Sequence, residues 1–546
     1  MSALLTLLLG IIPLDSIPWW HSGPQPYTYE NALADLDRDG DIDLAQGNEF
    51  TPVYVYLNTG NGLEQYPSWA STLSEGSTAI TWGDIDNDGY PELIVGTTQG
   101  PIRIYKNNGG TLETTPSWSS NPTGFGAMEI DVADVDCNGY LDIVYTDLVY
   151  GVSVYYNDSG IVETDPSWVG ATEYYNSCSA LGDINGDGFI DLAVGTNSAG
   201  YLEQVRIYMN NNGMFETTPS QTITDNWRPM GMVFCDIDND GDLDLLRGNG
   251  GPGVPNDPYP TCAHKNNNGI IESTPFWISS DTTWTMKICS ADFNGDGYLD
   301  IGKAVYTEYQ QPNGVYENLN GNFGVYPSWY SSDYRLSWGA LGGDIDGDGL
   351  QNAVDTLSGE GARKLFYLPH NNRIPLHSIN NVIVNNDTIP ITDYCYSLTY
   401  GWISFKNPPP SGTGNIIIHY TFSTCNEFIV GNVGAGTVIY HNLGTGVTER
   451  ASPSITSVIC FPNPFVSQTN ITYKIASPQS LDVSLKIFDS TGRIVRSLLS
   501  DIQSPGMHFI SWDGRDDKGF ELQSGIYFYQ LKVGREVKTG KIVHIK

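Results

Sequence analysis

Positive charge is scarce in this chain. Its 546 residues include 26 Lys and Arg against 62 Asp and Glu, which gives a formal net charge of −36. A field of that sign repels nucleic-acid phosphates and anionic membrane surfaces. We therefore expect no nucleic-acid partner, and we expect cations to be the natural ligands.

Long apolar runs are also missing. Residues 3–12 (ALLTLLLGII) are too few to cross a bilayer but have the length of a signal-peptide core. No basic residue precedes Arg38, and no A-x-A cleavage site follows. We predict a signal peptide over residues 1–15 with its cleavage point open, no transmembrane segment, and a secreted or extracellular protein.

Cysteines are dispersed, with no C-x-x-C pair and no dense disulfide framework. We expect most of them to be small buried hydrophobic residues, with one or two oxidised pairs left open. They are Cys137, Cys178, Cys235, Cys262, Cys289, Cys395, Cys425 and Cys460.

Catalytic motifs are absent. The chain has no HExxH, GxSxG, phosphate-binding GxxxxGK[ST] or GxGxxG motif, and its eight histidines are scattered. We predict that the protein is not an enzyme. A polysaccharide lyase or glycosidase remains the alternative, and it needs an acid or base in a central channel that the sequence does not reveal.

What the chain does have is Gly (60) and Tyr (33), which suits short strands and turns and predicts an all-β protein. Its length predicts two or three domains. Residues 453–546 hold 11 Lys and Arg against 8 Asp and Glu, whereas the preceding residues hold 15 against 54. That change predicts a domain boundary near residue 452.

An acidic loop, D-x-[DN]-x-[DN]-G-x-x-[DEN], recurs every 49 to 56 residues, which is the period of a propeller blade. In such a loop the side chains at positions 1, 3, 5 and 9 and the carbonyl at position 7 converge on one ion, and Gly at position 6 permits the turn. The predicted ligands of the seven loops are Asp35, Asp37, Asp39, Asp41, Asp43; Asp84, Asp86, Asp88, Tyr90, Glu92; Asp134, Asp136, Asn138, Tyr140, Asp142; Asp183, Asn185, Asp187, Phe189, Asp191; Asp236, Asp238, Asp240, Asp242, Asp244; Asp292, Asn294, Asp296, Tyr298, Asp300; and Asp344, Asp346, Asp348, Leu350, Asn352.

Oxygen ligands in this number favour Ca²⁺ over Mg²⁺ and Zn²⁺, so we predict about seven calcium sites. The main role expected for the ion is to clamp strands together, and direct contact with a ligand is the lesser alternative. The seventh loop ends in Asn352 in place of a carboxylate and is predicted to be the weakest site.

A hairpin and a short Pro-Ser-Trp strand follow most loops, so four strands per repeat predict a β-propeller. The tryptophans are expected to be blade-packing residues at an equivalent position in each repeat, with a sugar-binding platform as the alternative. Residues 16–20 resemble an isolated fourth strand, and residues 427–442 a hairpin without a loop. Together these favour eight blades over residues 16–452, with seven as the alternative and a β insert at 379–422.

The loops and hairpins resemble the FG-GAP and VCBS repeats of bacterial surface proteins, related to the integrin α propeller, over residues 27–442. Residues 453–546 resemble the Ig-like domain of the hook-capping protein and of type IX secretion sorting domains. Their markers are Pro462-Asn463-Pro464-Phe465, Ile487-Phe488-Asp489, Gly492-Arg493, Trp512-Asp513-Gly514-Arg515-Asp516 and Ser524-Gly525-Ile526-Tyr527-Phe528. The resemblance implies an Ig-like β-sandwich for export and attachment at the outer surface of a bacterium.

These features favour a surface binding or adhesion module whose partner is a glycan or a protein. The alternative is a self-assembling extracellular filament or array, in which the N-terminal strand completes a neighbouring copy.

Overall fold

The computed structural model describes residues 12–443 and 455–545, apart from residues 61, 75, 122–123, 171–174, 197–203, 226, 251–258, 282, 307–310, 370–372, 462, 476–480, 490–491, 504–505 and 534–535. The predicted signal peptide thus lies mostly outside the described residues. The chain divides into two compact units, Met1–Thr445 and Gly446–Lys546. No described helix is long and apolar enough to cross a membrane.

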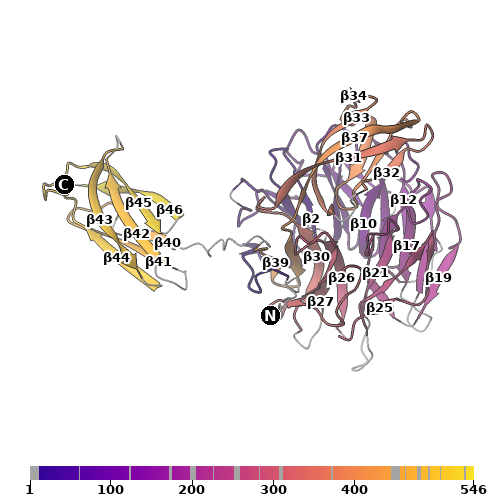
Figure 1. Cartoon of the computed structure of the whole chain (residues 1–546), viewed down its shortest axis with the longest axis horizontal. Helices are drawn as coiled ribbons and strands as arrows, with labels where there is room; N and C mark the ends of the chain where they lie inside the picture. Colours follow the sequence, from indigo (N-terminus) through magenta and orange to yellow (C-terminus); the bar gives the residue numbers. More distant parts are fainter. Residues whose placement is uncertain are drawn as a thin grey trace, which may run out of the picture. The chain divides into compact units, whose positions relative to one another are not determined.

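The first unit is a ring of seven four-stranded antiparallel sheets, or blades (Figure 1). Blades 1 to 4 are β2 (Tyr27–Ala34), β3 (Asp43–Glu49), β4 (Tyr54–Tyr56), β5 (Trp69–Ala70); β6 (Ser77–Gly83), β7 (Glu92–Thr97), β8 (Arg103–Tyr105), β9 (Trp118–Ser119); β10 (Ala127–Ala133), β11 (Asp142–Asp147), β12 (Gly151–Tyr155), β15 (Trp168–Val169); and β16 (Asn176–Gly182), β17 (Asp191–Thr196), β18 (Gln204–Tyr208), β19 (Gln221–Thr224). Blades 5 to 7 are β20 (Arg228–Cys235), β21 (Asp244–Gly250), β22 (Cys262–His264), β25 (Trp277–Ile278); β26 (Thr285–Ala291), β27 (Asp300–Val305), β28 (Gly314–Tyr316), β29 (Trp329–Tyr330); and β30 (Ser337–Gly343), β38 (Glu427–Asn432), β39 (Gly436–Tyr440), β1 (Trp20–His21). Two short hairpins, β13 (Asn157–Asp158) with β14 (Ile161–Val162) and β23 (Asn266–Asn267) with β24 (Ile270–Ile271), extend blades 3 and 5.

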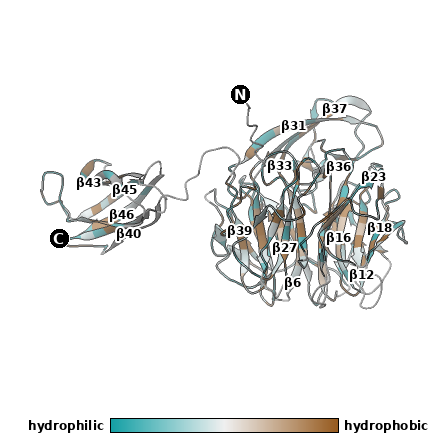
Figure 2. Ribbon diagram, turned by 60° about the horizontal axis from the view of Figure 1, so that its bottom comes forward, coloured by the Kyte–Doolittle hydropathy of each residue, from teal (hydrophilic) through white to brown (hydrophobic). Residues whose placement is uncertain are grey.

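The first strand of each blade is innermost and contacts the first strand of the next, and β30 contacts β2 to close the ring. Second strands such as Leu93–Val95 are buried on both faces, so the core runs between blades. Figure 2 shows these apolar bands along the strands. The predicted all-β propeller is confirmed.

The ring has seven blades, the alternative to the favoured eight. β30 precedes the seventh acidic loop and pairs directly with β38, from Ser337 opposite Asn432 to Gly343 opposite Glu427. The late hairpin that seemed to need an eighth blade is therefore the second and third strand of blade 7.

The N-terminal strand closes this blade as predicted. Trp20 pairs with Ile439 and His21 with Val438 on β39. Farther upstream, Ile12 and Leu14 are buried, and the Leu14 carbonyl accepts a hydrogen bond from the Trp329 indole (2.8 Å).

The insert within blade 7 is longer than the predicted 379–422. It begins with β31 (Leu350–Gly359) and ends with β37 (Gly412–Ser423), which pair along their length. β33 (Leu376–Val384) and β34 (Asp387–Thr388) extend this sheet. β32 (Leu365–Tyr367), β36 (Trp402–Phe405) and β35 (Tyr394–Ser397) form a second one, and the 3₁₀ turn Ile391–Asp393 precedes β35. The insert lies on one face of the ring (Figure 2).

The second unit is a β-sandwich, as predicted. One sheet has β40 (Ile455–Phe461), β41 (Thr469–Ile475) and β44 (Gly506–Trp512), and the other β43 (Ile494–Gln503), β42 (Leu481–Phe488), β45 (Gly525–Val533) and β46 (Glu536–His544). Trp512, Tyr473, Leu485 and Leu531 meet in its core. Of the seven cysteines whose side chains are described, none forms a disulfide and six are buried.

Candidate calcium loops and the central cavity

Each acidic loop forms the turn between the first and second strands of a blade. The aspartate at position 1 organises it: Asp84 accepts hydrogen bonds from the amides of Asp88 (3.0 Å) and Gly89 (2.9 Å), and Asp134 does the same in loop 3. The predicted glycines at position 6 have φ of 86° to 97° in loops 1 to 6. Position 4 is left-handed in all seven loops, which the sequence analysis did not anticipate.

The carboxylate at position 9 ties the loop to the third strand. Asp43 accepts the amide of Leu36 (2.9 Å) and, through its other oxygen, the amide of Asn58 (2.7 Å). Glu92, Asp142, Asp191 and Asp300 each accept the same two amides in their own blades. Position 9 therefore holds each loop to its own blade.

The asparagine that follows the third strand joins neighbouring blades. In each, Nδ2 donates to the position-2 carbonyl of the preceding loop at 2.6 to 2.9 Å. The bond from Asn58 to the Ile345 carbonyl (2.6 Å) joins blade 1 to blade 7. The donors are Asn58, Asn107, Asn157, Asn210, Asn266, Asn318 and Asn442.

The loop carboxylates crowd together as metal ligands do. In loops 1, 2, 3 and 5 three of them place oxygens within 4.8 Å of one another: Asp35, Asp37 and Asp39; Asp84, Asp86 and Glu92; Asp134, Asp136 and Asp142; Asp236, Asp238 and Asp240. Two such charges about 4 Å apart repel by ~4 kcal/mol at an effective dielectric of ~20. The oxygen donors are of the kind that calcium prefers, and where no side-chain cation already pairs with them the ion would neutralise the charge and hold the loop to the blade.

Burial adds to the crowding at position 9. It raises the pKa of Asp43 to about 7 and that of Glu92 to about 8, where the charge of Asp86 contributes as well. The pKa of Asp191 rises to about 8 for the same reasons, burial first and then the charge of Asp183. A bound cation would favour the ionised carboxylates and oppose these shifts.

Position 7 was predicted to contribute a backbone carbonyl. The structure shows the amide of this residue donating to the position-5 side chain, as Tyr90 does to Asp88 (2.9 Å) and Tyr140 to Asn138 (2.8 Å), and the role of its carbonyl stays a prediction. The residues that share this contact are Asp41, Phe189, Asp242 and Tyr298.

Loop 7 corrects one predicted ligand. Asn352 lies on β31 of the insert, is exposed, and accepts a hydrogen bond from Thr421 (3.1 Å). Position 9 is filled by Glu427, which accepts the Ile345 amide (2.8 Å) and the Asn442 amide (3.3 Å). Glu427, Asp346 and His441 form the ligand-type cluster here. The insert interrupts the loop after Gly349, so the carboxylate that takes position 9 is remote in sequence.

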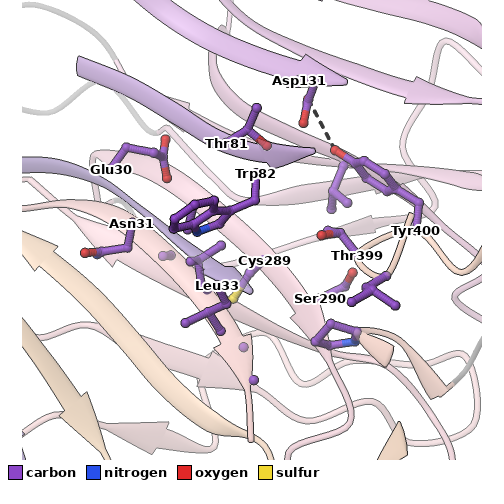
Figure 3. Close-up of a pocket in the computed structure, with 18 of the residues that line it drawn as sticks. Glu30, Asn31, Leu33, Thr81, Trp82, Asp131, Cys289, Ser290, Thr399 and Tyr400 are labelled. Carbon is purple, nitrogen blue, oxygen red and sulfur yellow. Dashed lines mark hydrogen bonds between the residues drawn. The ribbon is translucent and has the colours of Figure 1, made fainter. Parts of the chain in front are cut away.

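A second group of acids lies in the central cavity, about 190 Å³ in volume (Figure 3). Lys287 on β26 is 2.9 Å from Glu30 Oε2 on β2 and also pairs with Glu129 on β10. Tyr400 of the insert donates to Asp131 Oδ2 (3.3 Å). Burial and the charge of Glu129 raise the pKa of Asp131 to about 8.

This cluster places acids outside the loops and inside the central cavity, which the sequence did not reveal. Its members come from blades 1, 3 and 6, and only ring closure brings them together. The sequence does carry a signal for this cluster. The first strands of blades 3 and 6, AMEIDVA and TMKICSA, contain charged residues, whereas the first strands of blades 2, 4 and 5 contain no acid and no lysine. Asp131 can hold a proton near neutral pH, and Lys287 neutralises part of the remaining charge.

Two known families match parts of the chain. The FG-GAP-like repeat matches residues 35–95, 85–145 and 183–246, which contain loops 1 to 5. The chain carries FG-GAP-like repeats. The FlgD Ig-like domain matches residues 463–536, in the second unit. No curated protein matches the chain significantly.

Several solved structures resemble the chain at low sequence identity. One is PorZ, an essential bacterial surface component of the type-IX secretion system of Porphyromonas gingivalis, with 13% identity over 96% of this chain, 60% of that chain and a TM-score of 0.39. Two others are structures of BBS1N in complex with ARL6DN. The first has 15% identity over 59% of this chain and 91% of that chain, with a TM-score of 0.38. The second has 12% identity over 79% of this chain and 95% of that chain, with a TM-score of 0.42. These likenesses are too weak to support a functional conclusion.

The tryptophans of the FG-GAP-like repeats pack between blades. Trp69 of blade 1 meets Tyr105 of blade 2 edge-on (5.3 Å between ring centroids), and Trp20 of the N-terminal strand meets Tyr56 of blade 1 in the same way (5.3 Å). Trp118, Trp168, Trp277 and Trp329 make equivalent contacts. The expected packing role is thus the one the structure supports, in place of an exposed sugar platform.

Proposed function

We propose that the protein works outside the cell or at its surface as a calcium-stabilised β-propeller that binds a glycan or protein ligand. The acidic loops of the FG-GAP-like repeats and the apolar N-terminal run support the calcium and export parts. The FlgD Ig-like match supports attachment or sorting through the second unit, in line with the resemblance to type IX secretion sorting domains.

A tyrosine-lined cavity carries the binding part of this proposal. It has a volume of about 360 Å³, within the usual range for ligand pockets, and lies at the end of β11 opposite to loop 3. Tyr145, Tyr150 and Tyr155 line it together with Ser120 and Ser153.

The chemistry of this cavity suits a sugar ring. Aromatic faces offer apolar surface to C–H groups, and the serine and tyrosine hydroxyls donate and accept hydrogen bonds. Asp147 at the cavity holds the wall in place, because it accepts the amides of Phe125 (2.7 Å), Val149 (2.8 Å) and Tyr150 (2.8 Å).

Tyr150 provides the test, because its side chain is 59% exposed and its removal should leave the fold intact. We expect Tyr150→Ala to lose at least tenfold in affinity for the ligand found on a glycan or matrix-protein array. Tyr334→Ala is the matched control, since Tyr334 is 57% exposed and lies outside the cavity. Equal binding by wild type and Tyr150→Ala would contradict the proposed site.

Self-assembly by strand exchange is the second candidate, and pairing of β1 with β39 of its own chain supports the monomer instead. Deleting residues 1–22 separates the two: loss of polymers with an intact fold would favour assembly, and destabilisation of a monomer would favour self-closure. We propose no enzymatic activity.

A further inference from the structure

One position of the blade repeat faces the acidic loop and differs in charge between blades. It is the residue before the blade-joining asparagine. Lys106, Lys265 and His441 each contact the position-3 aspartate of their own loop, and Glu317 Oε1 is 3.5 Å from Asn294 Nδ2. The residues at this position are Leu57, Lys106, Tyr156, Met209, Lys265, Glu317 and His441.

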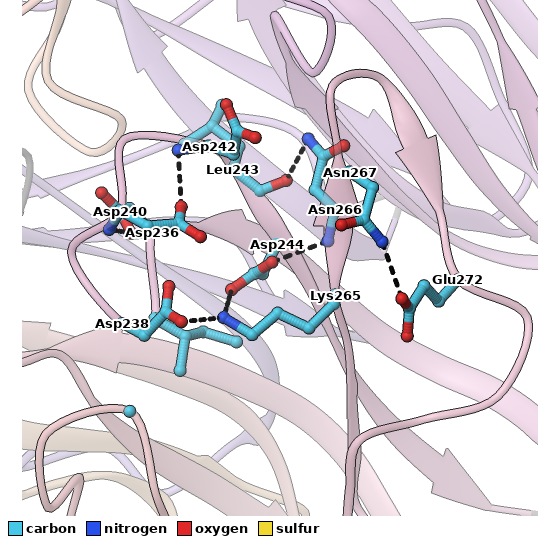
Figure 4. A network of polar contacts seen from close by, with 12 residues as sticks. Asp236, Asp238, Asp240, Asp242, Leu243, Asp244, Lys265, Asn266, Asn267 and Glu272 are labelled. Atoms are coloured by element: carbon cyan, nitrogen blue, oxygen red, sulfur yellow. Dashed lines mark hydrogen bonds and ion pairs between the residues drawn. The ribbon is translucent and has the colours of Figure 1, made fainter.

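In blades 2 and 5 this residue is a lysine, and its ammonium group lies among the predicted metal ligands. Lys265 Nζ pairs with Asp238 at position 3 and is 3.4 Å from Asp244 Oδ2 at position 9 (Figure 4). Lys106 Nζ pairs with Asp86 at position 3 and is 3.9 Å from Asp88 Oδ2 at position 5. Each ammonium group thus bridges two ligand positions.

The remaining oxygen of each paired aspartate shows where a metal would compete. Oδ1 of Asp86 and Oδ1 of Asp238 are buried and accept no hydrogen bond from a described residue. An ion bound there would lie within about 5 Å of the ammonium group, where a divalent and a monovalent cation repel strongly in a half-buried site. Lysine and calcium would therefore compete for these loops.

Other cations near the loops do not have this effect. Arg363 of the insert contacts Asp183 Oδ2 (3.0 Å), the oxygen that already accepts the Gly188 amide, and no second ligand position. Lys406 donates to the Tyr140 hydroxyl (2.8 Å), and no contact among the described residues joins it to a loop carboxylate. Only blades 2 and 5 place an ammonium group between ligands among the described contacts.

We propose that Lys106 and Lys265 are the built-in cations of loops 2 and 5, so that calcium at physiological levels occupies only loops 1, 3, 4, 6 and 7. This inference rests on the proposed calcium binding. We expect calcium affinity in loops 2 and 5 to be at least about 100-fold lower than in the others. Blades 2 and 5 would then keep their loops ordered without metal.

The test counts calcium sites tighter than about 0.1 mM by calorimetric titration of the full chain after removal of metal with EDTA. We expect five sites in wild type, seven in Lys106→Met/Lys265→Met, and six in each single variant, which serve if the double variant does not fold. Lys406→Met is the matched control and should keep five.

Seven tight sites in wild type, or an unchanged number in the lysine variants, would overturn the inference while leaving calcium binding intact. No binding by wild type or any variant would overturn the calcium proposal itself. Melting in EDTA gives a second readout: the double variant should lose more stability than wild type and regain it with calcium.

Discussion

At the scale of single residues, the blades are joined by asparagine side chains. Asn107 is fully buried and donates to the carbonyls of Leu36 in blade 1 and Pro91 in its own blade. Its backbone N–H donates a hydrogen bond to Glu92, the position-9 carboxylate. One residue therefore links a loop, its blade and the preceding blade.

Replacement of Asn107 by alanine should reduce the free energy of unfolding by about 2 kcal/mol, because two buried carbonyls lose their donor. Urea denaturation in excess calcium measures the loss. Asn108→Ala is the control, because Asn108 is the next residue and is exposed. Its side-chain amide donates an exposed hydrogen bond to Glu113. Equal losses in the two variants would contradict the joining role.

Asp131 should make the stability of the propeller depend on pH. Its pKa is about 8 in the folded protein, because of burial and the charge of Glu129, against about 3.9 when unfolded. Folding thus takes up a proton between these values, so the stabilising contribution is complete below about pH 4 and is lost as the pH rises through 8. Lys287 and the hydroxyl of Tyr400 also face this carboxyl group and lower its pKa, whereas the charge of Glu30 raises it further.

We therefore expect Asp131→Asn to gain stability relative to wild type as the pH rises from 5 to 8, by at most about 1.4 kcal/mol per pH unit. Urea denaturation at each pH, in excess calcium, gives the difference. Parallel curves for the two proteins would show that Asp131 is ionised throughout.

At the scale of elements, the insert shows how a long segment enters a loop without disturbing the blade. β31 leaves the loop at Leu350 and β37 returns at Ser423, and the Thr424 amide donates to the Gly349 carbonyl (3.1 Å). The two ends of the insert therefore lie side by side. Strand pairing within the insert offsets the entropic cost of bringing the ends of so long a segment together. Glu427 can then take the position that Asn352 holds in the sequence pattern.

Glu427→Gln should lower the free energy of unfolding by about 2 kcal/mol, since a buried carboxylate that binds two amides is neutralised. Asn352→Ala should stay within about 0.5 kcal/mol of wild type, because its side chain is exposed. Both are measured by urea denaturation in excess calcium. The reverse order would mean that Asn352 is the ligand after all.

At the scale of the whole molecule, the excess of acidic over basic residues belongs to the first unit. Residues 1–452 hold 54 of the 62 acidic residues, and the second unit contains none of the D-x-[DN]-x-[DN]-G loops. Calcium removal should therefore act on the propeller alone. The second unit serves as an internal control.

Calorimetry of the full chain should show two transitions, one for each compact unit. EDTA should lower the larger one by at least about 10 °C, because loss of several ions at ~1 kcal/mol each removes much of a domain's stability. The smaller transition should not move. Insensitivity of both would mean that the loops hold no metal.

The repeats could be predicted from sequence because six of the seven loops are local: nine consecutive residues form the turn between the first and second strands of a blade. Closure by Trp20 was predictable for the same reason, since a fourth strand lacked its blade. Glu427 could not be predicted, because the insert separates it from Asp344 by more than eighty residues in the chain.

The sequence by itself determined the fold class, the seven loops and the two-part organisation, because short-range patterns specify turns and strands. Only the tertiary structure decided the number of blades, the pairing of Lys287 with Glu30 and Glu129, and the placement of Lys106 and Lys265 among the loop carboxylates. The physical reason is that these contacts join residues from different strands, whose side chains meet only after the sheets pair and the ring closes.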